Sequence, residues 1–251
     1  MNMRWVALAA LMCACSSDRI VETDEAYFAW DQRRSLCGVG LDDKLGVGMG
    51  DIREGIERAR DRDEALIFYA HDIGDDLPAE RLEQVLQITS DLGVPFLTFP
   101  DLHRDPTPRA GVVITFDDAF VDNWHGARDL FAAYDARATF FMTRFWKQTR
   151  TRKDKLHELL ALGHAIESHG HNHIDGPRYA EELGVQAYVD DEVLPSLDAM
   201  REDGFDPSTF AYPYGARTGQ LDAAILERVE LVRSLSWLFA SSALVQDPCP
   251  E

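Results

Sequence analysis

Residues 111–118 read GVVITFDD. The stretch begins as an apolar, β-branched run typical of a buried strand, and it ends in two adjacent carboxylates, Asp117 and Asp118. Two acids at the end of a buried strand cost free energy unless they find partners. An Asp pair ordinarily serves in a solvated turn or as a helix N-cap. The rest of the chain favours a functional role for this pair.

Predicted strands and helices alternate outward from this stretch along almost the whole chain. Strands are expected at 64–70, 94–99, 111–116, 137–143, 164–168, 208–212 and 230–235. Helices are expected between them at 78–93, 123–136, 153–163, 188–204 and 220–229. The alternation predicts a parallel α/β architecture. About seven strands in 251 residues predict a distorted (β/α) barrel, a fold of about 250 residues.

An open, doubly wound sheet is the alternative architecture. It is disfavoured because the chain has no G-x-G-x-x-G after its first strand and no P-loop. The Gly-rich segment 35–50, SLCGVGLDDKLGVGMG, is expected to be a loop. Because the chain stops soon after the last predicted strand, the part from Glu25 to Asp63 is expected to complete the barrel.

The N-terminal stretch MNMRWVALAALMCACSSD has the pattern of an export signal. Arg4 precedes an apolar run that is too short to span a membrane. Residues 1–25 are therefore expected to lie outside the folded domain, which would comprise residues 26–251. A plain signal peptide and a lipoprotein signal remain open; in the second, Cys15 would be lipidated and attach the protein to a membrane. Either signal predicts an exported protein that is periplasmic, cell-surface or extracellular.

The composition of the chain limits the classes of molecule that it can bind and the pairings that its cysteines can form. The formal net charge of −19 argues against a nucleic acid, because binding a phosphate backbone needs a basic face. Cys37 and Cys249 lie outside the export segment and could form one disulfide in an oxidising compartment. Two unpaired cysteines are the alternative, and the sequence leaves both open.

Polar residues follow four of the predicted strands at the point where each strand ends. His71 follows the strand 64–70, and the Asp pair follows the strand 111–116. The segment SHGHNH (168–173) and the segment YPYG (212–215) follow two later strands. In a parallel barrel the carboxyl ends of the strands share one face, where active sites form. These four segments should therefore converge.

Two histidines and one carboxylate make a catalytic zinc set, and the same set also matches non-haem iron sites. His169 and His173 have the useful spacing, while His171 between them is expected to point elsewhere. A His-rich surface loop is the competing interpretation, and the nearby Asp pair disfavours it. One Asp would bind the metal, and its neighbour would take a proton from the metal-bound water.

The chain resembles the polysaccharide deacetylase family, carbohydrate esterase family 4, in three ordered motifs: TFDD, HGHNH and FAYPYG. The resemblance covers roughly residues 64–235. It implies Asp117 as the catalytic base, and it implies a metal ion, most readily zinc, bound by Asp118, His169 and His173. It also implies that the backbone N–H of Tyr214 helps to hold the oxyanion.

Three positions depart from the family pattern. Gly170 replaces a Ser or Thr in the second motif, and Ala119 stands where Gly is frequent. Ala211 stands where many members carry an Arg that orients the base. These departures weaken the predicted site without abolishing it.

The order of the motifs is the remaining feature. No His follows Gly215, whereas LIFYAHDIGDD precedes the Asp pair and looks like the displaced acid motif of the family. Poly-N-acetylglucosamine deacetylases of biofilm systems have this circularly permuted order. His71 is thus the candidate catalytic acid, and a histidine packed at the barrel rim is the alternative interpretation.

The resemblance implies a metal-dependent hydrolase of carbon–nitrogen bonds other than peptide bonds. Its substrate would be an N-acetylated polysaccharide or oligosaccharide, from which it removes acetyl groups. An O-acetyl carbohydrate esterase is one alternative. A catalytically inactive carbohydrate-binding surface lipoprotein is another, favoured by Ala119 and Ala211. An iron oxygenase is disfavoured because no His-x-Asp stands beside TFDD.

Overall fold

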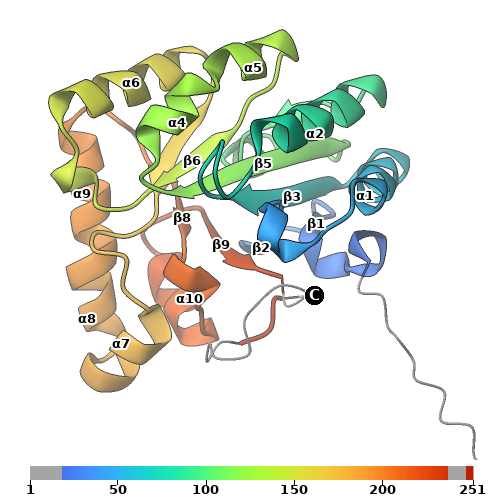
Figure 1. Ribbon diagram of the computed structural model, residues 1–251. Coiled ribbons are helices and arrows are strands. Elements are labelled where there is room, and N and C mark those ends of the chain that lie inside the picture. The colour runs from blue at the N-terminus through green and yellow to red at the C-terminus, as the bar shows by residue number, and fades with distance from the viewer. Residues whose placement is uncertain (1–18, 237–246, 251) are drawn as a thin grey trace, which may run out of the picture.

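The computed structural model describes residues 19–236 and 247–250. Within these residues, seven parallel strands close into a barrel with helices around its outside (Figure 1). The order around the barrel is β2, β9, β8, β7, β6, β5 and β3, and β3 pairs with β2 to close the ring. The predicted (β/α) barrel is confirmed. The seven strands are β2 (Ser35–Gly40), β3 (Ala65–Ala70), β5 (Gly111–Asp118), β6 (Thr139–Met142), β7 (Ala165–Ser168), β8 (Thr209–Ala211) and β9 (Leu231–Leu235).

The seventh barrel strand comes from a segment that was expected to be a loop. Its glycines are used for close packing: a Cβ at Gly40 would lie 2.0 Å from a side-chain carbon of Leu45 and 3.0 Å from the ring of Tyr69. Glycine in a strand often marks such an approach, so the loop prediction for 35–50 was wrong over β2. The predicted strand at 94–99 shortens to β4 (Phe96–Leu97), which pairs with β5 outside the ring. The short β1 (Tyr27–Phe28) pairs antiparallel with β3.

Helices cover the outer face of the strands through apolar stripes. In α2 (Ala79–Asp91) the buried residues Leu82, Val85 and Leu86 recur at the helical period. The predicted helix at 188–204 contains a π-helical turn, Val189–Val193, before it continues as α9. The other helices are α1 (Met49–Arg62), α3 (Asp101–Arg104), α4 (Val121–Gly126), α5 (Arg128–Ala133), α6 (Arg150–Ala161), α7 (Gly176–Leu183), α8 (Val185–Tyr188), α9 (Leu194–Glu202) and α10 (Gly219–Ile225).

Side chains alternate between the barrel interior and the outer layer. On β5, Val113 belongs to the inner cluster with Ile67, Phe141 and Leu231, whereas Val112 and Ile114 pack in the outer cluster. Because side chains alternate along a strand, position 117 continues the inward row of position 113. For the same reason position 233 on β9 points inward with position 231. The inward row of β5 therefore runs from the apolar Val113 through Thr115 to the carboxylate of Asp117.

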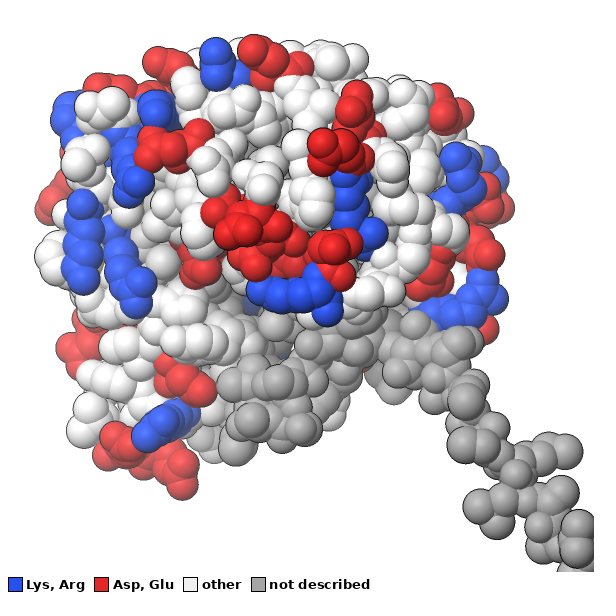
Figure 2. All heavy atoms as spheres, viewed as in Figure 1, with Lys and Arg blue, Asp and Glu red and all other residues white. Residues whose placement is uncertain are grey.

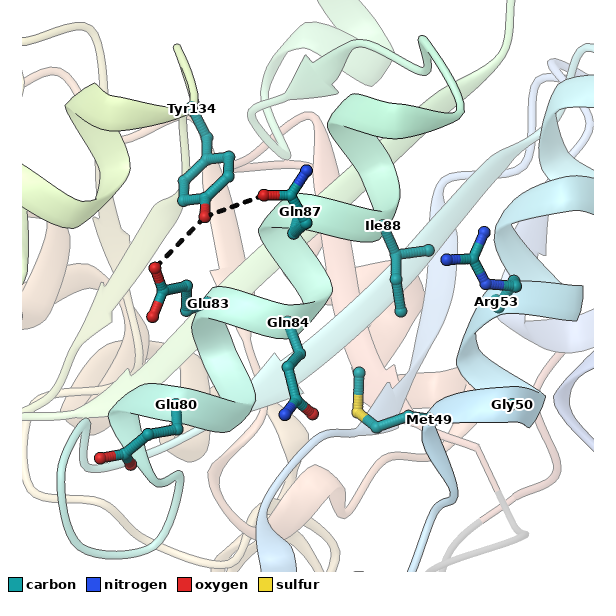
Figure 3. Close-up of a pocket in the computed structure, with 9 residues that line it drawn as sticks. All are labelled: Met49, Gly50, Arg53, Glu80, Glu83, Gln84, Gln87, Ile88 and Tyr134. Atoms are coloured by element: carbon teal, nitrogen blue, oxygen red, sulfur yellow. Dashed lines mark hydrogen bonds between the residues drawn. The ribbon is translucent and has the colours of Figure 1, made fainter.

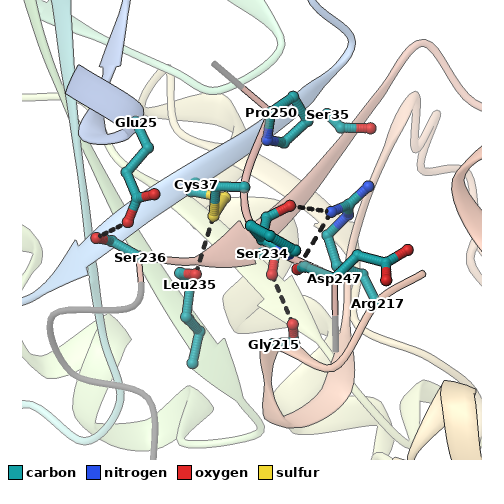
Figure 4. The surroundings of a disulfide bond; sticks show 12 residues. Glu25, Ser35, Cys37, Gly215, Arg217, Ser234, Leu235, Ser236, Asp247 and Pro250 are labelled. Carbon is teal, nitrogen blue, oxygen red and sulfur yellow. Dashed lines mark hydrogen bonds between the residues drawn. A yellow bond between two sulfur atoms is a disulfide. The ribbon is translucent and has the colours of Figure 1, made fainter. Parts of the chain in front are cut away.

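A disulfide joins Cys37 on β2 to Cys249 (Figure 4), which resolves the alternative that the sequence left open. The neighbouring residues are held as well, since Arg217 donates hydrogen bonds to the carbonyls of Asp247 and Pro248. Arg33 donates to the carbonyl of Pro250 at 2.9 Å. The segment 247–250 is thus attached to the barrel beside β2 and β9.

The packed domain begins before Glu25, because Ile20 is fully buried and its N–H donates to the carboxylate of Asp51. Residues 1–18, with Cys15, lie outside the described residues. In the part of the chain that the structure covers, no helix has both the length and the apolar character needed to cross a membrane. Figure 2 shows acidic side chains gathered near the middle of the visible face, with basic ones among and around them.

Candidate active site

A pocket of about 170 Å³ lies at the carboxyl ends of the barrel strands. All six predicted site residues line it, although they follow four different strands. His171 is not among the lining residues, and its ring instead stacks on Trp146 with centroids 5.4 Å apart. The lining consists of His71, Asp117, Asp118, His169, His173, Tyr214, Gly215 and Leu235.

Three of these residues offer a metal-ligand set. Asp118 Oδ1 lies 3.1 Å from His173 Nε2 and 3.9 Å from His169 Nε2. One ligand atom from each residue falls within 4.8 Å of the others, and no other such trio occurs among the described residues. This His₂–carboxylate set, with room beside it for water and substrate, has the chemistry of a catalytic zinc site.

The protonation of these groups suits metal binding. His169 Nδ1 donates to the carbonyl of Ala211 at 2.8 Å, which leaves Nε2 as the free donor atom. Burial lowers the pKa of His169 to about 4, so this imidazole is neutral at pH 7. Burial opposes ionisation of Asp118, but the hydrogen bond from His173 and the nearby imidazoles bring its pKa down to about 2. The site therefore presents a carboxylate and a neutral imidazole, as metal ligation requires.

A buried glutamate shapes the histidine loop. The carboxylate of Glu192, which is fully buried, accepts the N–H groups of Asn172 and Ile174 at 2.9 and 3.0 Å. A Cβ at Gly170 would lie 2.6 Å from Glu192 Oε1, and the φ of Gly170 is +84°. Gly170 therefore stands in the second motif because the Glu192 carboxylate occupies the space. Glu192 projects from the π-helical turn, a type of distortion frequent at functional sites, which a helical sequence pattern does not reveal.

Arg233 is the second residue that sequence reasoning missed. Its Nη2 lies 2.5 Å from both carboxylate oxygens of Asp117, and both side chains are buried. Its guanidinium also lies 5.3 and 5.6 Å from the ring centroids of Phe141 and Tyr69. Ala211, where many family members carry the arginine, pairs with Arg233 in the register of β8 and β9. The guanidinium that contacts Asp117 thus comes from β9, at the position that is paired with Ala211 of β8.

Asp42 is the third missed residue. Its Oδ2 lies 2.6 Å from His71 Nδ1, and its Oδ1 accepts the backbone N–H of His71 at 3.2 Å. Burial would lower the pKa of His71, but the Asp42 hydrogen bond and the charges of Asp117, Asp42 and Asp118 raise it above the usual value. Asp42 could have been found by the rule used for the other residues, because it follows the carboxyl end of β2, but the segment was expected to be a loop.

Tyr214 lies at the mouth of the pocket. Its side chain is 49% exposed, and its ring centroid lies 4.5 Å from that of His173. Its φ of +62° is in the left-handed region, as are those of Asp118 (+80°) and His173 (+67°). Non-glycine residues adopt this region rarely, and such strain concentrates at functional sites. Three residues of this pocket share that property.

A larger hollow of about 550 Å³ lies on the flank of the barrel, along α1 and α2 (Figure 3). Tyr134 at its edge donates to Glu83 and Gln87 at 3.3 and 3.2 Å. None of the nine lining residues belongs to the metal-ligand trio. Its larger size therefore does not make it the candidate active site, because the metal-ligand trio lies in the smaller pocket at the carboxyl ends of the strands.

The fold is similar to that of solved deacetylase structures. IcaB from Ammonifex degensii aligns with a TM-score of 0.59 and 18% identity, over 74% of this chain and 91% of that one. The Streptococcus pyogenes deacetylase PplD in complex with acetate aligns with a TM-score of 0.52 and 21% identity, over 66% and 79% of the chains. A de-N-acetylase from Aggregatibacter actinomycetemcomitans aligns with a TM-score of 0.55 and 17% identity, over 68% and 94%. The comparison with curated proteins found no match.

A sequence profile identifies the family independently of these structures. Residues 104–230, half of the 251-residue chain, match the profile described as Polysaccharide deacetylase. The matched range includes the Asp pair, both candidate histidine ligands and Tyr214, whereas His71 and Arg233 fall outside it. The chain therefore belongs to the polysaccharide deacetylase family, hydrolases that act on carbon–nitrogen bonds.

Proposed function

We propose that this protein is a metal-dependent carbohydrate N-deacetylase, which releases acetate from N-acetylated sugars of a polysaccharide. The observation that carries the proposal is the single pocket in which an arginine-paired carboxylate, a His₂–carboxylate trio and an Asp-paired histidine meet. Amide hydrolysis needs each of these groups: a base, an electrophile and a proton donor for the amine.

The residues fit a divalent ion, for which zinc is the proposed identity. Asp118, His169 and His173 would hold it, and a bound ion of this kind polarises a carbonyl oxygen and acidifies water. The contact from Arg233 holds the Asp117 carboxylate in one orientation, so that it can take a proton from the attacking water. The backbone N–H of Tyr214 would donate to the carbonyl oxygen as negative charge develops there.

His71 completes the proposed reaction as the general acid. The raised pKa favours the protonated form of the imidazole, and Asp42 on Nδ1 leaves Nε2–H to donate to the departing amine. An amine leaves poorly without this proton, whereas an alkoxide depends on it less. The Asp42–His71 pair therefore favours an N-acetyl substrate over an O-acetyl ester. His71 precedes the matched motifs in the sequence, which is the circularly permuted order that we propose for this chain.

Acetate release from matched substrates tests the function. The purified protein, loaded with zinc, is incubated with N-acetylglucosamine oligosaccharides and in parallel with O-acetylated xylo-oligosaccharides. We expect acetate chiefly from the N-acetylated sugars and none after treatment with a chelator. Release from the esters alone would replace the proposal with an esterase, and no release from either would favour a binding protein.

Replacing Asp42 by Asn should move the alkaline side of the pH–rate profile to lower pH. The carboxylate of Asp42 raises the pKa of His71, so its neutralisation lowers that pKa, and the proton is lost earlier as the pH rises. We expect amide turnover on the alkaline side of the profile to fall by about tenfold, a part of the 10²–10⁴-fold contribution of a general acid. Turnover at pH values below the lowered His71 pKa of the variant should change little. An unshifted profile would contradict the acid role of His71.

We also propose that the protein is exported, either by a plain signal peptide or by a lipoprotein signal that lipidates Cys15. The Cys37–Cys249 disulfide supports export, because such bonds persist in oxidising compartments. If Cys15 is lipidated, a Cys15→Ser variant should move from the membrane fraction to the soluble fraction. Wild-type protein that is already soluble would favour a plain signal peptide.

A further inference from the structure

His173 differs from the other two members of the metal-ligand trio in how the fold holds it. Asp118 is the last residue of β5, and His169 directly follows β7. His173 instead stands in the loop 169–175, which joins β7 to α7 and which we call the histidine loop. Its backbone has a φ of +67°, yet its Nε2 lies 3.1 Å from Asp118 Oδ1. The position of this ligand therefore depends on the contacts that fix the loop.

Glu192 accepts hydrogen bonds from the backbone on both sides of His173. The N–H of Asn172 donates to both of its carboxylate oxygens at 2.9 Å, and the N–H of Ile174 donates to Oε1 at 3.0 Å. The N–H of His171 donates to its backbone carbonyl at 3.0 Å. Hydrogen bonds to an ionised group are shorter and stronger than those between neutral groups. One residue thus fixes the loop immediately before and after the ligand.

The π-helical turn that carries the glutamate is itself tied to its surroundings. Tyr179 of α7 donates to Asp191, the residue before the glutamate, at 2.7 Å. Tyr188 is fully buried, and its hydroxyl donates to the carbonyl of Ile174 at 3.4 Å. A Cβ at Gly176 would lie 3.2 Å from the ring of Tyr188, so this tyrosine has little room to move. The turn is therefore a firm support for the histidine loop.

A carboxylate is a costly group to place here unless the loop needs it. The Glu192 side chain is fully buried, and its hydrogen bonds come from N–H groups of the histidine loop rather than from a cation. An apolar side chain would fill the same space, but the N–H groups of Asn172 and Ile174 would then be left without their acceptor. The carboxylate is therefore explained by the loop that it holds.

We propose that Glu192 is a positioning residue of the metal site, which holds His173 in place to bind the ion. It would touch neither the metal nor the substrate, and it would act through the backbone of the histidine loop. The affinity for zinc would then depend on a residue outside the ligand trio. This inference rests on the proposed metal-dependent function and adds a residue that determines how tightly the metal is held.

The test measures the zinc dissociation constant of Glu192→Gln by competition with a chromogenic chelator. The variant keeps the size of the side chain, but its amide group has only one oxygen to replace the two that accept the N–H of Asn172. We expect the dissociation constant to rise by about 10–100-fold, the usual effect of losing a partner that orients a metal ligand. Turnover lost at limiting zinc should return at saturating zinc, which a general folding defect would not allow.

Glu167→Gln is the matched control, because Glu167 is also fully buried and also accepts backbone N–H groups. Its partners are Ser208 and Thr209, at 2.8 and 2.7 Å, which lie at the start of β8. Both bonds use the same carboxylate oxygen, so glutamine can keep them. We expect this variant to bind zinc as the wild type does. Urea unfolding of the metal-free proteins shows that both variants are folded.

The outcomes separate this inference from the proposed function. Wild-type zinc affinity in Glu192→Gln, an equal loss in Glu167→Gln, or turnover that saturating zinc does not restore would each overturn the positioning role while leaving the function intact. A wild-type protein that binds no zinc would overturn both. If Glu192→Gln does not fold, Glu192→Asp replaces it with the same expectation, because the shorter side chain draws the carboxylate away from the loop.

Discussion

The Asp118→Ala variant should lose its divalent ion and at least about 10³-fold in turnover of the N-acetylated substrate. The expectation follows from the geometry, because Asp118 supplies the only carboxylate of the metal-ligand trio in the described part of the chain. A metal ion that acts as a Lewis acid contributes several kcal/mol to the transition state, and each 1.36 kcal/mol is a tenfold effect. Metal content by mass spectrometry and acetate release are the two measurements.

Asp122→Ala is the matched control for this variant. Asp122 is an aspartate of the same region, but it contacts Arg152 and Lys155 on the surface. It should keep full metal content and wild-type turnover. His169→Ala should behave like Asp118→Ala. Full metal occupancy in both ligand variants would show that the trio does not hold the ion.

Arg233→Met should destabilise the protein by about 3–5 kcal/mol, the cost of leaving one member of a buried ion pair uncompensated. Asp117 would then be a buried carboxylate without its cation. Urea unfolding followed by circular dichroism measures this loss. Turnover should fall as well, because the Asp117 carboxylate loses the contact that orients it as the proposed base.

Moving the arginine separates its chemical role from its role in packing. Positions 211 and 233 are paired neighbours on β8 and β9, so their side chains point to the same side of the barrel. The double variant Ala211→Arg/Arg233→Ala returns the guanidinium to the strand that carries it in many relatives. We expect it to recover stability and turnover relative to Arg233→Met. If it is as impaired as the single variant, Arg233 contributes through its packing against Tyr69 and Phe141 instead.

The barrel fold, apart from its strand β2, and most of the polar residues around its mouth could be predicted from the sequence alone. Both conclusions rest on local patterns. Strand and helix periods alternate along the chain, and a polar residue directly after a strand must lie at the carboxyl edge of a parallel sheet. His71, Asp118 and His169 could be assigned to one face in this way without knowing the order of the strands.

The partners of those residues could be identified only in the folded chain, because each partner is remote in sequence and has no distinguishing pattern in its own segment. Arg233 lies 116 residues from Asp117 in an ordinary strand pattern, and only the pairing of β8 with β9 places it there. Asp42 follows the strand β2, whose glycine-rich sequence is typical of a loop. The glycines are present because the strand packs closely against Tyr69. Glu192 turns toward the histidine loop because a π-helical turn redirects it. Local periodicity predicts which face of a strand or helix a side chain occupies. Which charged residue it contacts depends on how distant strands come together in the barrel, and no short segment of sequence contains that information.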